Sequence, residues 1–251
     1  MEPIIVKNIA ELIKAVDKIF TSTNSRWWFR GQMNEKWDLL PYVKRSYSKD
    51  NERYMTNLFY TGAKSRYPNC PSAHDYGAWL ALMQHHGLPT RLLDWTHSLI
   101  VAAYFATKYS FDMDQQDNLT DAAIWSLDPI ELNISHGYED VFPPLDARSV
   151  VSMVRPAFKG VDIDKPAVLA VAPIESDMKI FAQHGTFTVH VSDKPLNLMD
   201  GSEAWLRKII VPKQHVPNMA LELDALGLRL SDYFPDLYHL ARDIKRGRSH
   251  K

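Results

Sequence analysis

The chain has 251 residues, of which 45% are hydrophobic and 24% are charged, and its formal net charge is −1. This composition supports a sizeable core and excludes a wholly disordered chain. The small net charge excludes a protein held on nucleic acid mainly by bulk positive charge, although it leaves room for a local basic groove. Cys70 is the one cysteine, which excludes an intramolecular disulfide and a zinc site built from cysteines.

The N-terminal sequence predicts neither a signal peptide nor a membrane segment. Its first residues, MEPIIVK, lack a long apolar core and a small-residue cleavage site. No stretch approaches the ~18 consecutive apolar residues of a membrane span. We therefore expect a cytoplasmic protein without a membrane partner.

The first half of the chain is predicted to be mainly helical. Apolar residues at helical spacing, together with proline and glycine stop signals, predict four helices over residues 8–21, 51–66, 75–86 and 97–108. The last of these has too many apolar residues for a single face, so it should be deeply buried. Between the first two helices, the aromatic-rich segment 26–31 predicts a short strand that ends at Gly31.

The second half of the chain shows the pattern of strands. A polar stretch at 112–120 predicts a loop, and short apolar runs predict strands over residues 122–127, 167–172, 185–191 and 205–211. Helices are predicted again over 216–226 and 235–244, before a basic tail. We expect a single α+β domain over residues 1–251, with a helix-rich first half packed on a mixed or antiparallel sheet.

Arg30 is the first candidate functional residue. It follows an aromatic strand and precedes Gly31, which permits a tight turn and close backbone approach. A guanidinium at such a place suits a phosphate or carboxylate ligand. The alternative is structural: Arg30 stacks on Trp27 or Trp28, or pairs with an acid of the fold.

The segment from Gln84 to His97 is the second candidate, because it concentrates polar residues between two apolar helices. Asp94 or Thr96 can cap the following helix, whose N-terminus would then offer an anion site. The alternative is that Asp94 only caps and Arg91 only pairs with it. Neighbouring histidines at 85 and 86 match no common zinc spacing, so no metal site is predicted.

These stretches resemble, in order, the motifs of the FRG domain family. The similarity rests on Phe29-Arg30-Gly31, on the run HGLPTRLLDWT over residues 86–96, on the helix AAYFA over 102–106, and on IFAQHGTF over 180–187. The motifs lie between residues 24 and 191, which leaves residues 213–247 for C-terminal helices. The resemblance implies an FRG-type domain.

A more distant similarity connects the same order of motifs to ADP-ribosyltransferases. It implies a split sheet and NAD as cofactor, with Arg30 on the NAD phosphate or ribose and with Asp94 and Thr96 supporting the nicotinamide pocket. Gln183 lies near the position of the family's glutamate, and because glutamine is neutral, Asp94, Glu175 or Glu222 would supply the negative charge. Further residues implied in cofactor binding are Phe29, Gly31, Gln32, His86, Thr90, Arg91, Trp95 and Tyr104.

Three functions are therefore compared. The first is an NAD-dependent ADP-ribosyltransferase acting on RNA, DNA or protein, as a toxin or antiphage effector that an antitoxin partner would restrain. The second is a module in which Arg30 and Arg91 bind phosphate of a nucleotide or nucleic acid without NAD turnover. The third is a hydrolase or nuclease that uses His85 or His86 as general base with Asp94 as orienting acid.

Overall fold

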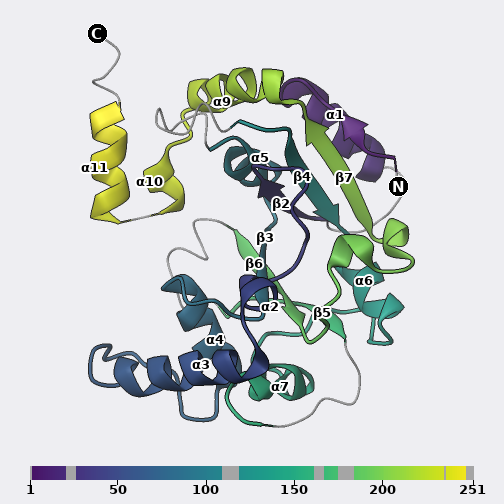
Figure 1. Cartoon of the computed structure of the whole chain (residues 1–251). Coiled ribbons are helices and arrows are strands. Elements are labelled where there is room, and N and C mark those ends of the chain that lie inside the picture. The colour runs from purple at the N-terminus through teal and green to yellow at the C-terminus, as the bar shows by residue number, and fades with distance from the viewer. Residues whose placement is uncertain are drawn as a thin grey trace.

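A computed structural model describes residues 2–20, 27–108, 119–160, 167–174, 184–234 and 236–246 (Figure 1). These residues form an α+β structure around a seven-stranded sheet. The strands are β1 (Ile4–Ile5), β2 (Trp28–Gln32), β3 (Leu92–Thr96), β4 (Ala122–Leu127), β5 (Val168–Val171), β6 (Gly185–His190) and β7 (Leu206–Val211).

The helices lie between and after these strands. They are α1 (Ile9–Phe20), α2 (Tyr42–Ser46), α3 (Lys49–Ala63), α4 (Tyr76–His85), α5 (Leu99–Thr107), α6 (Pro129–Ser135), α7 (Arg148–Val154), α9 (Val216–Ala225), α10 (Leu230–Tyr233) and α11 (Leu237–Arg246). Short 3-10 helices are η3 (Arg155–Ala157), η4 (Leu196–Leu198), η5 (Ser202–Ala204) and η6 (Lys213–His215). None of the described helices is long and apolar enough to cross a membrane.

The sheet is mixed, with the strand order β1-β7-β4-β2-β3-β6-β5. Its neighbours pair antiparallel except β1 and β7, which are parallel. Strand β1 is therefore an edge strand. It pairs with β7, the last strand along the chain, and Ile4 lies opposite Ile209. Of the two expected alternatives, a mixed or an antiparallel sheet, the structure therefore has the mixed one.

The centre of the sheet is divided between β2 and β3. These strands are joined through a single residue pair, Phe29 opposite Thr96. In contrast, β2 pairs with β4 along its whole length from Trp28 to Gln32, and β3 pairs with β6 from Leu92 to Thr96. Beyond Phe29 and Thr96 the two strands therefore diverge, and the facing backbone groups are available to side chains and ligands.

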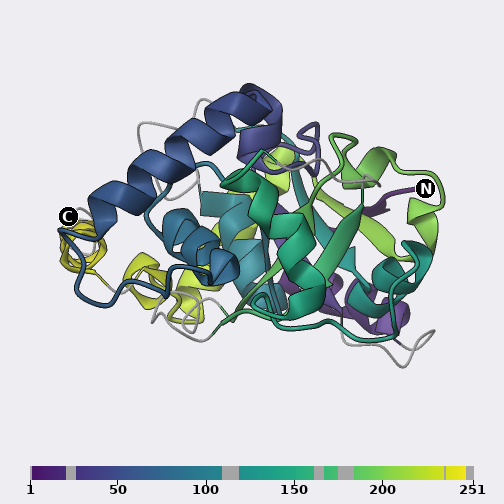
Figure 2. The same cartoon turned by 90° about the horizontal axis from the view of Figure 1, so that it is seen from below.

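Two groups of helices cover one face of the sheet, one on each side of this division (Figure 1). Helices α1, α5 and α9 pack on β2, β4 and β7 around Leu12, Ala102 and Met219. Helices α4 and α7 pack on β3, β5 and β6 around Trp79 and Met153, and α3 lies outside them, as the view from below also shows (Figure 2).

The opposite face of the sheet buries a cluster of large aromatic side chains. Alternate residues of each strand point to this side, because successive side chains of a strand face opposite directions. Trp28, Trp95 and Trp125 come from β2, β3 and β4, and Trp205 precedes β7. One continuous apolar layer therefore supports both halves of the sheet behind the division.

Most elements predicted from periodicity are confirmed, with boundaries shifted by a few residues. The helix expected at 8–21 is α1, and the strand expected at 122–127 is β4. The helix expected to be deeply buried is α5, with Val101, Ala102, Ala103, Tyr104 and Ala106 all buried. Most of the loop expected at 112–120 lies outside the described residues.

The prediction for the segment before α5 is wrong in two respects. The segment contains the strand β3 where only a polar connection between helices was expected. Neither Asp94 nor Thr96 is the N-cap of α5, because that residue is Ser98, whose side chain accepts a hydrogen bond from the Val101 amide. The cap falls later than expected because the chain first completes its pairing with β6.

Candidate functional site

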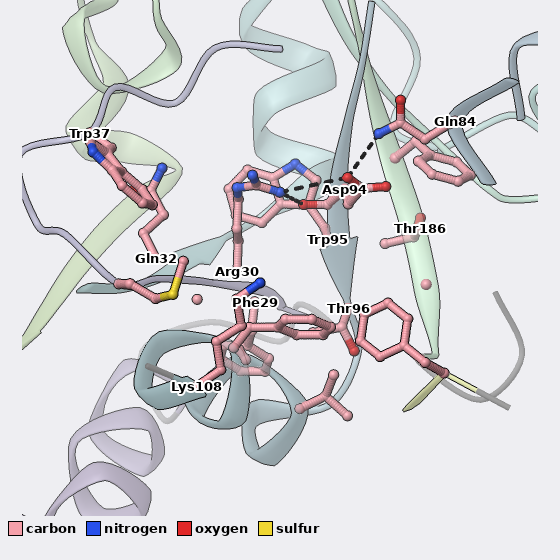
Figure 3. A pocket seen from close by; sticks show the side chains of 18 of the residues that line it. Phe29, Arg30, Gln32, Trp37, Gln84, Asp94, Trp95, Thr96, Lys108 and Thr186 are labelled. Atoms are coloured by element: carbon pink, nitrogen blue, oxygen red, sulfur yellow. Dashed lines mark hydrogen bonds and ion pairs between the residues drawn. The ribbon is translucent and has the colours of Figure 1, made fainter. Parts of the chain in front are cut away.

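A pocket of about 330 Å³ opens where β2 and β3 diverge (Figure 3). Its walls come from both strands, from α4 and α5, from the start of β6 and from the segment that follows β2. The lining residues are Phe29, Arg30, Gly31, Gln32, Met33, Trp37, Arg45, Ala81, Gln84, His85, Asp94, Trp95, Thr96, Val101, Ala102, Phe105, Lys108, Gly185, Thr186, Phe187 and Phe234. The site therefore lies between the two helix groups.

Arg30 occupies the division of the sheet. Its Nη1 donates a 2.6 Å hydrogen bond to the Asp94 carbonyl oxygen, which the divergence leaves free of the neighbouring strand. The same nitrogen lies 4.0 Å from Oδ2 of Asp94, and the Arg30 side chain keeps one fifth of its surface exposed. Its buried Nε has no hydrogen-bond partner among the described residues. The guanidinium thus retains donor capacity for a ligand.

Asp94 is held by a short chain of hydrogen bonds from α4 (Figure 3). The Gln84 amide nitrogen donates to Oδ2 of Asp94 at 2.8 Å. The Thr90 hydroxyl donates to the Gln84 amide oxygen at 2.6 Å, which fixes the orientation of the amide. The Asp94 side chain remains 54% exposed, so the carboxylate is oriented but still open to the pocket.

The two residues that follow Asp94 in β3 form hydrogen bonds on opposite faces of the sheet. The Thr96 hydroxyl accepts from the Ser98 amide at 3.0 Å, at the entry to α5. The Trp95 indole nitrogen donates to the Thr188 hydroxyl at 3.0 Å, on the other side of the sheet. Thr188 in turn lies 2.9 Å from Nε2 of His190. The strand that carries Asp94 is therefore fixed on both faces.

Positive charge predominates in the pocket. Its lining contains Arg30, Arg45 and Lys108, against Asp94 as the carboxylate among the described lining residues. Burial is the main cause of a lowered pKa for all three basic groups, and Arg45 lowers the pKa of Arg30 further while Asp94 opposes the shift. This electrostatic environment favours an anionic ligand.

The structure brings most of the predicted site residues together. The candidates that line the pocket are Phe29, Arg30, Gly31, Gln32, Asp94, Trp95 and Thr96. Gln183 and Glu175 lie outside the described residues. Glu222 is on α9, where its carboxylate accepts from the Ile9 amide at 2.8 Å and caps α1.

Four candidates for cofactor binding do not line the pocket. Arg91 is buried and pairs with Glu52 through two hydrogen bonds of 2.8 and 2.6 Å, and not with Asp94. Tyr104 is in the core against Tyr233, with ring centroids 4.9 Å apart. His86 packs between aromatic rings of α3 and its following turn, and Thr90 acts one step behind the wall through Gln84.

Several lining residues were not expected from the sequence. Trp37, on the segment after β2, is one of them. Gln84 and His85, at the end of α4, belong instead to the candidate segment 84–97. Arg45 and Lys108 are basic residues at the C-terminal ends of α2 and α5, where cations are common because of the helix dipole. No local signal distinguishes Arg45 and Lys108 from other basic residues at helix ends, since it is the tertiary fold that brings both side chains to one cavity.

The histidine pair does not form one site. Only His85 lines the pocket, and its ring meets that of His86 edge-on at a centroid distance of 4.7 Å. Within the described ranges, no group of three or more His, Cys, Asp or Glu residues is arranged to hold a metal ion. A role shared by both histidines therefore has no support in the arrangement.

Comparison with known proteins finds one family model that matches part of the chain. The model of the FRG domain matches residues 25–115, a segment that runs from β2 through α5 and contains Arg30, Asp94 and Thr96. No curated protein and no solved structure shows significant similarity to the chain. Residues 25–115 thus match the FRG domain, and this segment supplies most of the walls of the pocket.

Proposed function

We propose that the protein is an ADP-ribosyltransferase that moves ADP-ribose from NAD to a nucleic acid or protein. One observation carries the proposal: Arg30, Asp94 and Thr96, from two distant parts of the chain, line a single pocket at a division of the sheet. The volume, about 330 Å³, is near the lower end of the range of roughly 300–1,000 Å³ for ligand sites. It suits the nicotinamide ribose part of NAD.

The reaction requires a positive charge to be stabilised. The bond between the ribose C1′ and the nicotinamide nitrogen breaks, and its electron pair neutralises the pyridinium. Positive charge develops on the ribose, and the Asp94 carboxylate, oriented by Gln84, is the group that opposes it. A hydroxyl or amine of the acceptor forms the new bond to C1′, and its proton passes to Asp94.

Arg30 and the aromatic residues would bind the two ends of this part of NAD. The Arg30 guanidinium, whose Nε lacks a partner among the described residues, suits a phosphate or ribose oxygen. Trp37 and Phe105 both line the pocket, and Trp37 is 39% exposed, so an aromatic face is available for the nicotinamide ring. Arg30 and the aromatic residues would thus bind and orient NAD, whereas Asp94 would stabilise the positive charge.

The test is release of nicotinamide from NAD by the purified protein, with RNA, DNA and lysate protein offered separately as acceptors. We expect release with one acceptor class. Arg30→Gln should reduce it about 10- to 100-fold, because a charged hydrogen bond of about 1.5–3 kcal/mol is lost. Asp94→Asn should reduce turnover by about 100-fold or more while NAD binding persists. Arg53→Gln, on the outer helix α3, is the matched control.

A second function is favoured by the excess of basic residues in the pocket. A module that binds a nucleotide without turnover would use the same arginine and need no catalytic carboxylate. In that case NAD or a nucleotide would bind in an Arg30-dependent manner, and Asp94→Asn would bind it no less tightly. Absence of nicotinamide release with all three acceptors would select this function over the transferase.

A further inference from the structure

Three basic side chains reach the pocket from three separate elements. Arg30 is on β2, Arg45 is in the last turn of α2, and Lys108 directly follows α5. Figure 3 shows the Lys108 side chain beside α5, and the Arg30 side chain directed toward Asp94. With Asp94 as the acidic lining residue, the described lining has an excess of two positive charges.

Among the described residues, the fold opposes these charges only in part: Asp94 lies 4.0 Å from Arg30, and Asp38 raises the pKa of Arg45 without forming an ion pair with it. Arg30 and Arg45 donate to backbone carbonyls, the latter from Nε to Leu40 at 2.7 Å. Neither Arg45 nor Lys108 forms an ion pair with a described residue, and the Lys108 side chain makes no hydrogen bond with one. Arg91 provides the contrast, since its buried guanidinium is matched by Glu52. Arg30 and Lys108 are half-buried and Arg45 is exposed, yet desolvation lowers the pKa of all three groups. A bound anion would offset this cost of desolvation.

The helix dipole accounts for only part of this arrangement. A basic residue at the end of α5 is favoured by the partial negative charge there. That effect would be equally satisfied by a side chain directed to solvent, so it explains the residue type but not the convergence of Lys108 and Arg45 on the cavity that holds Arg30. An anion within the cavity explains both.

We propose that Arg45 and Lys108, together with Arg30, form a subsite for a diphosphate group. Two negative charges on adjacent phosphates match the excess of two positive charges in the lining. The inference rests on the proposed function, in which the diphosphate belongs to NAD, and it adds the residues that hold this part of the cofactor. The size of the pocket, about 330 Å³, favours a small molecule over a nucleic-acid backbone as the source of the phosphates.

The experiment measures binding by titration calorimetry with inorganic pyrophosphate, ADP-ribose and adenosine as probes. The proteins are the full chain, Arg45→Gln, Lys108→Gln and the control Lys194→Gln, whose side chain pairs with Asp200 at the surface. We expect pyrophosphate and ADP-ribose to bind the unchanged chain and the control equally. Each pocket variant should bind both about 10-fold more weakly or worse, while any affinity for adenosine stays the same.

Folding controls separate lost charge from lost structure. Arg45→Lys and Lys108→Arg keep the charge and should recover part of the affinity, less for Arg45→Lys because a lysine lacks the planar fork. Thermal unfolding of all variants is recorded alongside. A Gln variant that unfolds at the temperature of the unchanged chain and has lost pyrophosphate binding supports the subsite.

The results also separate this inference from the proposed function. Binding of ADP-ribose that depends on Arg45 and Lys108, without any nicotinamide release, keeps the subsite and rejects the transferase. Nicotinamide release that needs Arg30, with ADP-ribose affinity unchanged in both Gln variants, keeps the transferase and overturns the subsite. The subsite is also overturned if pyrophosphate and ADP-ribose fail to bind while an oligonucleotide does.

Discussion

At the scale of single residues, two arginines of the family motifs have opposite environments. Arg30 lies at the division between β2 and β3, and its Nε has no hydrogen-bond partner within the described part of the chain. Arg91 is fully engaged: Glu52 accepts two of its hydrogen bonds, and the Met153 carbonyl accepts a third at 2.7 Å. The same side chain therefore suits ligand binding in one place and connects α3, β3 and α7 in the other.

The Arg91 pair leads to a prediction about stability. Glu52→Gln leaves the Arg91 guanidinium buried without its counter-charge, which should destabilise the fold by about 3–5 kcal/mol. Urea unfolding followed by circular dichroism measures the change. The control is Asp200→Asn, which removes a surface pair and should leave the midpoint unchanged. Equal midpoints for both variants would show that Arg91 finds other partners.

At the scale of elements, the pocket depends on how closely α5 approaches β2. Gly31 makes this approach possible, because a Cβ at that position would lie 1.9 Å from the Ala102 carbonyl oxygen and 2.6 Å from the Ala106 nitrogen. Both atoms are backbone and cannot rotate away. The glycine of the family tripeptide is thus explained by packing, and it sets the position of Lys108 at the end of α5.

Gly31→Ala should therefore affect both stability and binding. The added methyl group forces α5 away from β2, at a cost of about 1–3 kcal/mol or more, and it moves Lys108 relative to Arg30. We expect a lower unfolding midpoint and weaker pyrophosphate binding. Gly160→Ala is the control, since a Cβ there meets nothing within 4 Å. A Gly31→Ala protein with unchanged stability would contradict the close packing.

At the scale of the whole molecule, a buried histidine makes stability depend on pH. His190 ends β6 in the interior of the sheet, and burial, reinforced by Lys44, Arg30 and His136, lowers its pKa from 6.5 to about 3. Between these two values the unfolded chain holds a proton that the folded chain does not. Raising the pH through this window therefore adds stability, and lowering it removes stability.

The prediction is a loss of up to about 1.4 kcal/mol per pH unit as the pH falls from 6.5 toward 3. His190→Gln removes the titrating group while keeping an amide near the Thr188 hydroxyl, so this part of the slope should disappear. Urea unfolding at a series of pH values measures it. Comparison at pH 7.5, where the histidine is neutral in both states, isolates the packing effect of the substitution. If the free energy of unfolding of both proteins falls with the same slope below pH 6, His190 is not the group responsible.

Local sequence was sufficient for much of the secondary structure and for part of the site. Helices such as α1 and α5, and strands such as β4, follow from periodicity because that signal comes from residues a few positions apart. The order of the family motifs indicated Arg30, Asp94 and Thr96, and all three line the pocket. The motifs that indicated an FRG-type domain between residues 29 and 106 lie within the segment that matches the FRG domain.

Tertiary structure decided what depends on distant partners. Leu92–Thr96 is short and has an exposed Asp94 at its centre, so it becomes a recognisable strand only through pairing with β6, about ninety residues later. Arg91 does not line the pocket, because it pairs with Glu52, which lies 39 positions earlier. Arg45 and Lys108 do line the pocket, because of the way α2 and α5 pack. Sequence by itself determined most of the helices and strands and which motif residues are polar, because those properties are local. The fold alone determined which charges are neutralised and which face the cavity, because that depends on contacts between residues far apart in the chain.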